Sequence, residues 1–282
     1  MGLYFCSLNS GSNGNCYYIG NETDAILVDA GISCRETEKR MKKLGLVMDR
    51  VRAIFISHEH GDHISGLAVL AKKFKLPVYI TQQTQKHTLF RAEIPQTVPF
   101  TESLPVKIGS LTITPFRKYH DAIDPHSFVI EHEKVTVGVF TDIGKVCERL
   151  VHYFSKCNAA FLEANYDADM LENGNYPIHL KNRIRGGEGH LSNAEALQLF
   201  RQHRPSYMSH LLLSHLSKNN NTPELVEKLF KEYSGGTQII IASRYHETDL
   251  FYVKSDGHYL IAKTRPTKKK HEFQLSLFAN PA

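Results

Sequence analysis

Three histidines and an aspartate fall within six residues of this 282-residue chain, in the stretch His58-Glu59-His60-Gly61-Asp62-His63. Imidazole and carboxylate groups suit zinc, manganese or iron, and the stretch contains no soft thiolate ligand. It follows an apolar run at residues 52–57 that predicts a buried strand, and it precedes a helical pattern that begins near Ile64. Four such groups at the carboxyl end of a strand can hold two divalent cations. The stretch therefore predicts a metal site.

Two later segments repeat this arrangement of an apolar strand that ends in a polar ligand. Residues 211–214 run into His215, and residues 135–140 run into Thr141 and Asp142. Loops at one edge of a sheet are where a scaffold usually presents reactive groups, so these side chains are expected near the first stretch. His120 follows a strand predicted at residues 111–116. His126 is an alternative to His120, and His210, which begins its strand, is an alternative to His215.

The elements that position these ligands are strands and helices that alternate along the chain. Strands are predicted at residues 17–19, 25–28, 52–57, 78–81, 111–116, 127–131, 135–140, 159–162, 211–214, 238–242, 250–253 and 258–262, and helices at 35–43, 64–74, 82–92, 146–154, 193–203 and 223–233. Mixed strands with helices in both halves favour an α/β (α+β) architecture of two packed sheets covered by helices. One catalytic domain is expected at residues 1–263 and a tail at 264–282.

These motifs together resemble those of the metallo-β-lactamase superfamily, whose fold is an αββα sandwich. The matching residues are Asp29 in Leu-Val-Asp-Ala-Gly, His58-x-His60-x-Asp62-His63, His120, Asp142 and His215. Within the superfamily the chain is most similar to the bacterial WalJ/YycJ group of nuclease-like proteins. The closer match lies in the segments 10–16, 120–122, 141–144, 162–167 and 189–193. The resemblance covers residues 1–262.

The resemblance implies two divalent metal ions in each chain, zinc first, with manganese or iron as alternatives. It assigns His58, His60 and His120 to one ion, Asp62, His63 and His215 to the other, and Asp142 to both. Two such ions activate water near neutral pH and clamp the attacking and leaving oxygens of a phosphodiester. The expected catalytic residues are Asp62 and His190.

Further candidates each have a second interpretation. His190 is similar to a non-ligand histidine of related nucleases, but it also precedes a helix start, because Ser192-x-x-Glu195 is a capping box. Glu163 ends an apolar strand, where it could accept from a ligand imidazole or simply be solvated. The loop at residues 10–15 could form an anion-binding nest or a hairpin entry. Expected substrate-binding residues are Ser12, Asn13, Asn15, Ser192 and Arg244. Arg244 could contact a phosphate, although a surface arginine is the default interpretation.

Composition and charge limit the class of protein. No apolar run approaches the roughly 20 residues of a membrane span, and residues 1–20 are too polar for a signal peptide. Five irregularly spaced cysteines argue against a disulfide framework and favour the reducing cytoplasm. The chain has a net charge of +5, but residues 263–282 contain five basic side chains and a single acid. Attraction to polyanions is thus concentrated in the tail.

The tail also contains Gln274-Leu275-Ser276-Leu277-Phe278. Its apolar side chains suit a short anchor that docks in a partner's groove, and the alternative is packing on its own domain. The pentapeptide resembles the bacterial sliding-clamp-binding motif, with Gln274, Leu275, Leu277 and Phe278 at the defined positions. A clamp partner favours DNA as substrate.

The expected function is therefore a cytoplasmic, two-metal phosphodiesterase acting on DNA in repair or replication. Exonuclease activity with 5′→3′ polarity is implied by the resemblance alone. Alternatives on the same fold are an RNA-processing nuclease and a small-molecule ester or thioester hydrolase, because fold alone does not fix chemistry. A non-catalytic adaptor is disfavoured by the complete ligand set.

Overall fold

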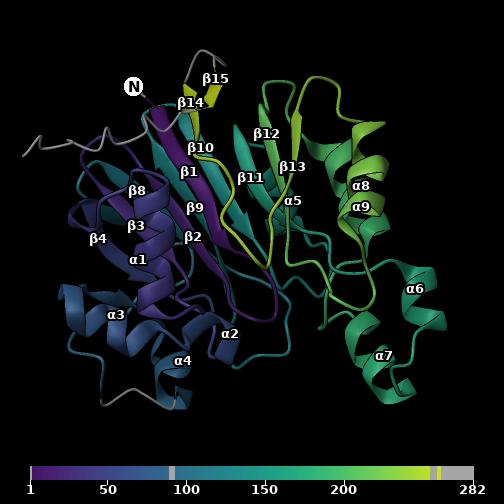
Figure 1. Ribbon diagram of the computed structural model, residues 1–282, viewed down its shortest axis with the longest axis horizontal. Coiled ribbons are helices and arrows are strands. Elements are labelled where there is room, and N and C mark those ends of the chain that lie inside the picture. The colour runs from purple at the N-terminus through teal and green to yellow at the C-terminus, as the bar shows by residue number, and fades with distance from the viewer. Residues whose placement is uncertain (1, 89–92, 255–258, 262–282) are drawn as a thin grey trace, which may run out of the picture.

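The computed structural model describes residues 2–88, 93–254 and 259–261, which form two β-sheets facing each other (Figure 1). In the described residues the first sheet has eight strands, in the order β15 (Tyr259–Ile261), β14 (Phe251–Lys254), β1 (Gly2–Asn9), β2 (Cys16–Gly20), β3 (Ala25–Val28), β4 (Val51–Phe55), β5 (Val78–Tyr79) and β6 (Thr97–Val98). The second has seven, in the order β13 (Gln238–Ile241), β12 (His210–Ser214), β11 (Ala159–Glu163), β10 (Val135–Phe140), β9 (His126–His132), β8 (Leu111–Arg117) and β7 (Val106–Ile108).

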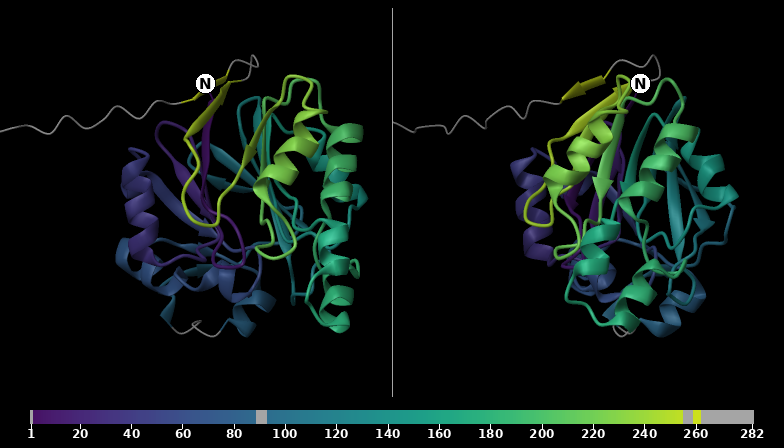
Figure 2. Two further views of the ribbon diagram at one scale, coloured as in Figure 1. Left: turned by 45° about the vertical axis from the view of Figure 1, so that its right-hand side comes forward. Right: turned by 90° about the vertical axis from the view of Figure 1, so that its right-hand side faces the viewer.

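Helices cover the outer face of each sheet, as Figures 1 and 2 show. Beside the first sheet lie α1 (Cys34–Lys43), the 3-10 helix Met48–Arg50, α2 (Gly61–Ile64), α3 (Leu67–Phe74) and α4 (Gln82–His87). The second sheet is covered by α5 (Glu148–Phe154), α8 (Asn193–His203) and α9 (Pro223–Lys231). Two further helices, α6 (Ala168–Asn173) and α7 (Ile178–Arg185), extend beyond the end of the second sheet. The predicted αββα sandwich is confirmed.

Side chains alternate between the two faces of each strand, and this alternation explains how the sheets form separate core layers. In β1, Leu3 and Phe5 enter the core between the sheets, whereas Cys6 and Leu8 enter the core beneath α1 and α3. A strand's successive side chains point to opposite faces, so a strand buried on both sides is apolar throughout. A third core joins the outer face of the second sheet to α5, α8 and α9. Each sheet is thereby fixed from both sides.

Several predicted elements differ from those observed. The single helix predicted at residues 64–74 is two helices, α2 and α3, because the chain turns at Ser65 and Gly66, where a Cβ on Gly66 would meet the Ile32 carbonyl oxygen at 1.9 Å. Strands β1, β6 and β7 and helices α6 and α7 were not predicted at all. The segment 82–92 is helical as α4 only to His87, and residues 89–92 lie outside the described part.

In the described residues, no helix is both long and apolar enough to cross a bilayer.

The strands that precede the candidate ligands end at one edge of the sandwich. Strands β3 and β4 are parallel, as are β10, β11 and β12, so their carboxyl ends lie together at the lower edge in Figure 1. The predicted ligands follow these ends.

Candidate metal centre

The first group of candidate ligands consists of three imidazoles. His58 and His60 follow β4, and His120 follows β8 on the opposite sheet. Nδ1 of His60 lies 3.0 Å from Nε2 of His58 and 3.3 Å from Nε2 of His120. Three nitrogen atoms thus converge on one point, a donor set that suits a divalent metal ion.

The second group contains Asp62, His63, Asp142 and His215. Nε2 of His63 lies 3.2 Å from Oδ2 of Asp142 and 3.5 Å from Oδ2 of Asp62. Nε2 of His215 lies 3.5 Å from the same Asp62 oxygen. Four ligand atoms from both sheets therefore face a common space.

Asp142 lies between the two groups. Its Oδ1 is 3.8 Å from Nε2 of His120 in the first group, while its Oδ2 faces His63 in the second. Oδ2 of Asp142 and Nε2 of His215 are buried and have no hydrogen-bond partner of good geometry among the described residues. Buried polar atoms without partners are costly, and a cation at this position would satisfy both. The residues present thus fit divalent metal ions.

A layer of hydrogen bonds fixes the orientation of the rings. Nδ1 of His63 is 2.7 Å from Oδ2 of Asp29, and the Ser57 hydroxyl donates to the same oxygen at 2.9 Å. Because that hydroxyl gives its proton to Asp29, it accepts from Nδ1 of His58. Nδ1 of His120 similarly contacts the Gly189 carbonyl at 3.0 Å. Each ring therefore directs Nε2 inward, as outer partners of metal ligands do.

Glu163 performs this role for two rings. Its Oε1 accepts from Nδ1 of His215 and from Nδ1 of His190, each at 2.9 Å, while its Oε2 accepts the Ile143 and Leu191 backbone N–H groups. The Glu163 side chain is fully buried at the end of β11. Of its two interpretations from the sequence, contact with a ligand imidazole is the one the structure supports.

The electrostatics follow from burial and charge. Burial lowers the pKa of His58 well below its usual range, with the charge of His63 adding to the effect, and burial lowers the pKa of His120 to about 4. Burial also opposes charge on His215, but the nearby carboxylates of Asp142, Asp62 and Glu163 outweigh it and raise the pKa of His215 to about 10. The carboxylates thus carry the negative charge that a pair of cations would balance.

Backbone geometry is unusual at three strand ends. Asp29, Asp142 and His215 have φ angles of 61°, 55° and 56°, in the left-handed region that few non-glycine residues occupy. Each is the residue at which the chain leaves the sheet and turns its side chain towards the centre. Such conformations cluster at functional sites because the surrounding structure holds them there.

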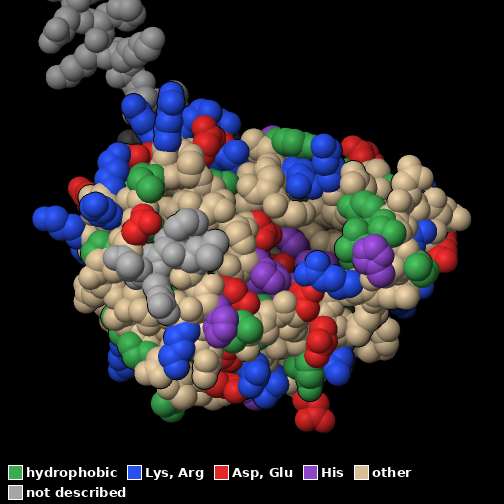
Figure 3. All heavy atoms as spheres, turned by 90° about the horizontal axis from the view of Figure 1, so that it is seen from below, with side chains coloured by type: hydrophobic (Ala, Val, Ile, Leu, Met, Phe, Trp, Pro, Cys, Tyr) green, Lys and Arg blue, Asp and Glu red, His purple; other side chains and the backbone are tan. Residues whose placement is uncertain are grey.

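The pocket over the centre is about 490 Å³ in volume, and it is lined by five of the candidate ligands, by His190 and Ser12, and by the α7 residues Leu180, Arg183 and Ile184. Figure 3 shows histidine side chains gathered in this hollow, with acidic and basic side chains around it. Helix α7 was not predicted from the sequence, because its few apolar residues are mixed with basic ones, and in the structure none of its residues is buried. Lys118, buried nearby with Nζ 2.7 Å from the Thr141 carbonyl, was also not anticipated.

The remaining predicted residues are placed as follows. Asn15 is buried and its amide donates to Asp62 at 3.1 Å, whereas Ser12 and Asn13 are exposed. Ser192 caps α8 in a capping box with Glu195, and Arg244 lines a neighbouring cavity. Neither of these two lines the pocket over the centre. His126 packs on Phe100 and His210 on Phe5 and Phe251, so the structure brings His120 and His215 to the centre and leaves both alternatives outside.

Comparisons with known proteins agree with this geometry. Residues 24–215 match the family model described as the Beta-lactamase superfamily domain. The chain is 34% identical to Exodeoxyribonuclease YycJ of Bacillus anthracis over 256 residues, which are 88% of this chain and 96% of that protein. It is 30% identical to Exodeoxyribonuclease WalJ of Streptococcus pneumoniae over 230 residues, 80% of this chain and 86% of the relative. The crystal structure of the metallo-beta-lactamase fold protein YhfI from Bacillus subtilis has a TM-score of 0.67 at 20% identity, covering 88% of this chain and 99% of that one.

Proposed function

This chain belongs to the metallo-β-lactamase superfamily and to its YycJ and WalJ group, and we propose that it hydrolyses phosphodiester bonds at the ends of DNA with two divalent metal ions. The chain is a metal-dependent nuclease. The DNA substrate and the exonuclease mode are supported by the names of its relatives. We further propose that the enzyme cleaves in the 5′→3′ direction. We take residues 1–263 as the catalytic domain.

In this proposal His58, His60 and His120 would hold one ion, Asp62, His63 and His215 would hold the other, and Asp142, which lies between the two groups, would serve both. When bound, such ions supply a nucleophile from water near neutral pH and neutralise the charge of the phosphate. Zinc is the first candidate because the ligands are mainly imidazole, and manganese or iron also suit the set.

The chain's own residues position and protonate the substrate. His190 lies on the pocket wall, 23% exposed, with Nδ1 held by Glu163. Its Nε2 can then give a proton to the leaving oxygen, which general-acid catalysis requires. Asp62 is assigned to orient the attacking water as well as to bind metal. Arg183 on α7 and Ser12 line the same pocket, which supports their assignment to contacts with the DNA backbone.

The observation that carries this proposal is the position of Asp142, with one oxygen towards each group of ligands. End-labelled single- and double-stranded DNA and RNA, incubated with metal-loaded protein, test it directly. Shortening of DNA from one end, abolished by chelator and by Asp142→Ala, is expected. Hydrolysis of RNA alone, or of a thioester alone, would contradict it.

The proposal extends to a partner and a location. Gln274, Leu275, Leu277 and Phe278 lie outside the described residues, and we propose that they bind the bacterial DNA polymerase sliding clamp as an extended peptide. The support is the pentapeptide itself and the basic residues that precede it. A cytoplasmic location is supported by the five cysteines, all of which are free.

A further inference from the structure

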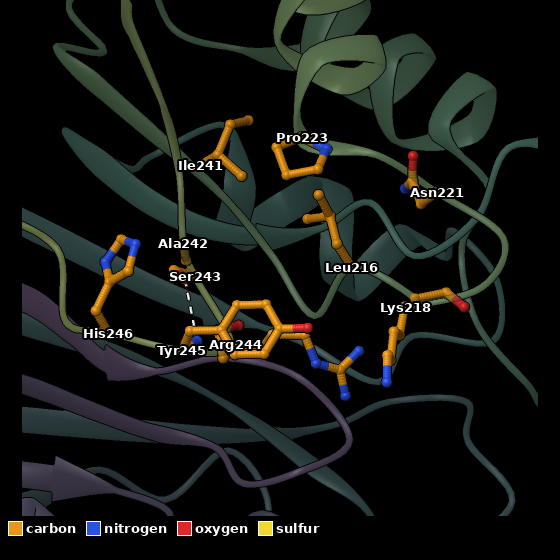
Figure 4. A pocket seen from close by; sticks show the side chains of 12 residues that line it. Leu216, Lys218, Asn221, Pro223, Ile241, Ala242, Ser243, Arg244, Tyr245 and His246 are labelled. Carbon is orange, nitrogen blue, oxygen red and sulfur yellow. Dashed lines mark hydrogen bonds between the residues drawn. The ribbon is translucent and has the colours of Figure 1, made fainter.

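A second cavity of about 330 Å³ lies beside the metal centre, between the end of β13 and the start of α9 (Figure 4). Its walls are apolar and come from Leu216, Pro223, Ile241 and Ala242. The volume is at the lower end of the range for small-molecule sites, in which apolar walls and a few polar groups are usual. The cavity is thus large enough for one flat ring system.

The cavity adjoins the metal pocket. Ser217 lines both, and it lies two residues beyond His215, so their Cα atoms are at most roughly 7 Å apart. Ser10 also lines the cavity, and its hydroxyl accepts the backbone N–H of His215 at 2.8 Å. A polymer with one unit at the metal centre can therefore place the adjacent unit in the cavity.

Two basic side chains, Arg244 and Lys218, line the cavity. Their charged ends lie on the same side in Figure 4, and the lining residues of the cavity include no aspartate or glutamate. Within the part of the chain that the structure describes, neither side chain forms an ion pair, and Nη1 of Arg244 is shielded from water without a hydrogen-bond partner. A guanidinium presents several donors in a fixed fork that suits phosphate oxygens. The cavity rim is therefore complementary to an anion.

An aromatic ring completes the arrangement. Tyr245 lines the cavity and is 69% exposed, although large aromatic side chains are usually buried. Exposed aromatic rings beside a basic groove are the platforms on which proteins stack bases of single strands. Basic groups that can donate to a phosphate, an apolar wall and an exposed aromatic ring thus line the same cavity.

We propose that this cavity binds the nucleotide adjacent to the cleaved bond, with its base between Tyr245 and the apolar wall and its phosphate held by Arg244 and Lys218. The inference rests on the proposed nuclease function, because it assigns the neighbouring unit of the same strand. Stacking accepts every base, so the site adds affinity without sequence preference.

Oligonucleotides that carry a single abasic unit at each of the first three positions from either end test the proposal. With the wild type, the abasic unit at one position should raise KM about five- to tenfold, the loss expected for one stacked base. Tyr245→Ala should raise KM for the intact strand and remove that difference. Additive effects of the abasic unit and the substitution would overturn the base site.

Arg244→Ala should raise KM about tenfold or more for every oligonucleotide, because a charge-assisted contact is lost. Arg50→Ala and Lys228→Ala are matched controls, since both residues are exposed and lie outside the cavity. An unchanged KM for Arg244→Ala would reject the phosphate site.

A binding experiment separates failure of the cavity assignment from failure of the proposed nuclease function. If the wild type cleaves no oligonucleotide, titration with deoxyadenosine 5′-monophosphate decides whether the cavity is a nucleotide site. Binding by the wild type that Arg244→Ala and Tyr245→Ala both weaken supports the inference. Equal binding by all three proteins overturns it.

Discussion

Oε1 of Glu163 lies 2.9 Å from Nδ1 of His190. Burial by itself raises the pKa of Glu163, but the charge of His190 and the hydrogen bonds from His190 and His215 outweigh it and lower the pKa to about 2. The carboxylate is thus ionised at neutral pH and holds Nδ1–H of His190 in place. This leaves Nε2 of His190 as the nitrogen available on the pocket wall.

His190→Ala should lower kcat by about 10²–10⁴-fold, the usual contribution of a general acid, while metal content stays unchanged. Steady-state kinetics with saturating metal, together with elemental analysis, measure both quantities. His203→Ala, at the end of α8, is the matched control. Loss of metal along with activity would make His190 a ligand, which its place in a third cluster with Asp142, Glu163 and His215 allows.

Glu163→Gln should lower both kcat and metal affinity. The amide keeps the shape of the side chain but loses the charge that orients His190 and His215, and loss of such an outer partner costs about 10- to 100-fold in affinity or activity. Metal affinity measured by competition with a chelator separates this variant from His190→Ala. An effect on kcat alone would show that His215 needs no support from Glu163.

Wild-type protein should bind two metal ions, and Asp142→Ala should lose more metal than His58→Ala because its carboxylate faces both groups. Both variants should be inactive and remain folded by circular dichroism. His87→Ala, an exposed histidine on α4, should bind as the wild type does. Saturation at one ion per chain would refute the two-ion centre.

Metal binding should release protons and strengthen as pH rises. The pKa values of His63 and His215 are raised because nearby carboxylates outweigh burial, so both rings carry a proton at neutral pH before metal binds. A ligand imidazole must be unprotonated, so protons compete with metal below the raised pKa. Between pH 7 and 9 we expect about two protons released per chain, measured in weak buffer with a pH indicator. A pH-independent affinity would contradict the assignment.

A peptide of residues 268–282 should bind a bacterial sliding clamp with micromolar or weaker affinity, since so short a segment buries little surface. Deletion of 274–282 should leave hydrolysis of a short oligonucleotide unchanged and remove any stimulation by clamp-loaded DNA, because tethering acts through effective concentration. Fluorescence anisotropy with a Leu277→Ala, Phe278→Ala peptide as control measures the first effect. Absence of saturable binding at several hundred micromolar, the weak end of such affinities, would reject the partner.

The parts of this fold that could be predicted are those with strong local signals. The bounds of α8 and β10 were predicted to the residue, because Ser192 and Glu195 form a capping box and residues 135–140 are rich in valine and other strand-forming residues. The sequence favoured His120 over His126 as the candidate ligand. The choice could be decided only by how β8 and β9 pair, and strand pairing is a long-range property.

Other features depend on tertiary contacts that leave no pattern in the sequence. Strand β1 was missed because it buries two polar residues, Ser7 and Asn9, whose partners lie far away in the sequence. The Ser7 backbone N–H donates to the Thr248 hydroxyl, and Arg40 donates to the Asn9 side chain. The contact of Glu163 with two rings arises from a register between β11 and β12 that places Glu163 beside Ser214. The cavity at Arg244 is lined by three separate segments, at Ser10, residues 216–223 and residues 241–246, so no single segment of the sequence reveals its composition.

Because the candidate ligands come from both sheets, metal ions bound at the centre would link the two sheets. His58, His60, Asp62 and His63 follow a strand of the first sheet, whereas His120, Asp142 and His215 follow strands of the second. Ions that bind only the folded protein raise its free energy of unfolding, and here they would oppose separation of the two sheets. The gain is about 2.7 kcal/mol for each site at a free ion concentration 100 times its Kd. Metal supply would then govern the lifetime of the folded enzyme as well as its activity, so that a cell starved of the ion loses the protein itself.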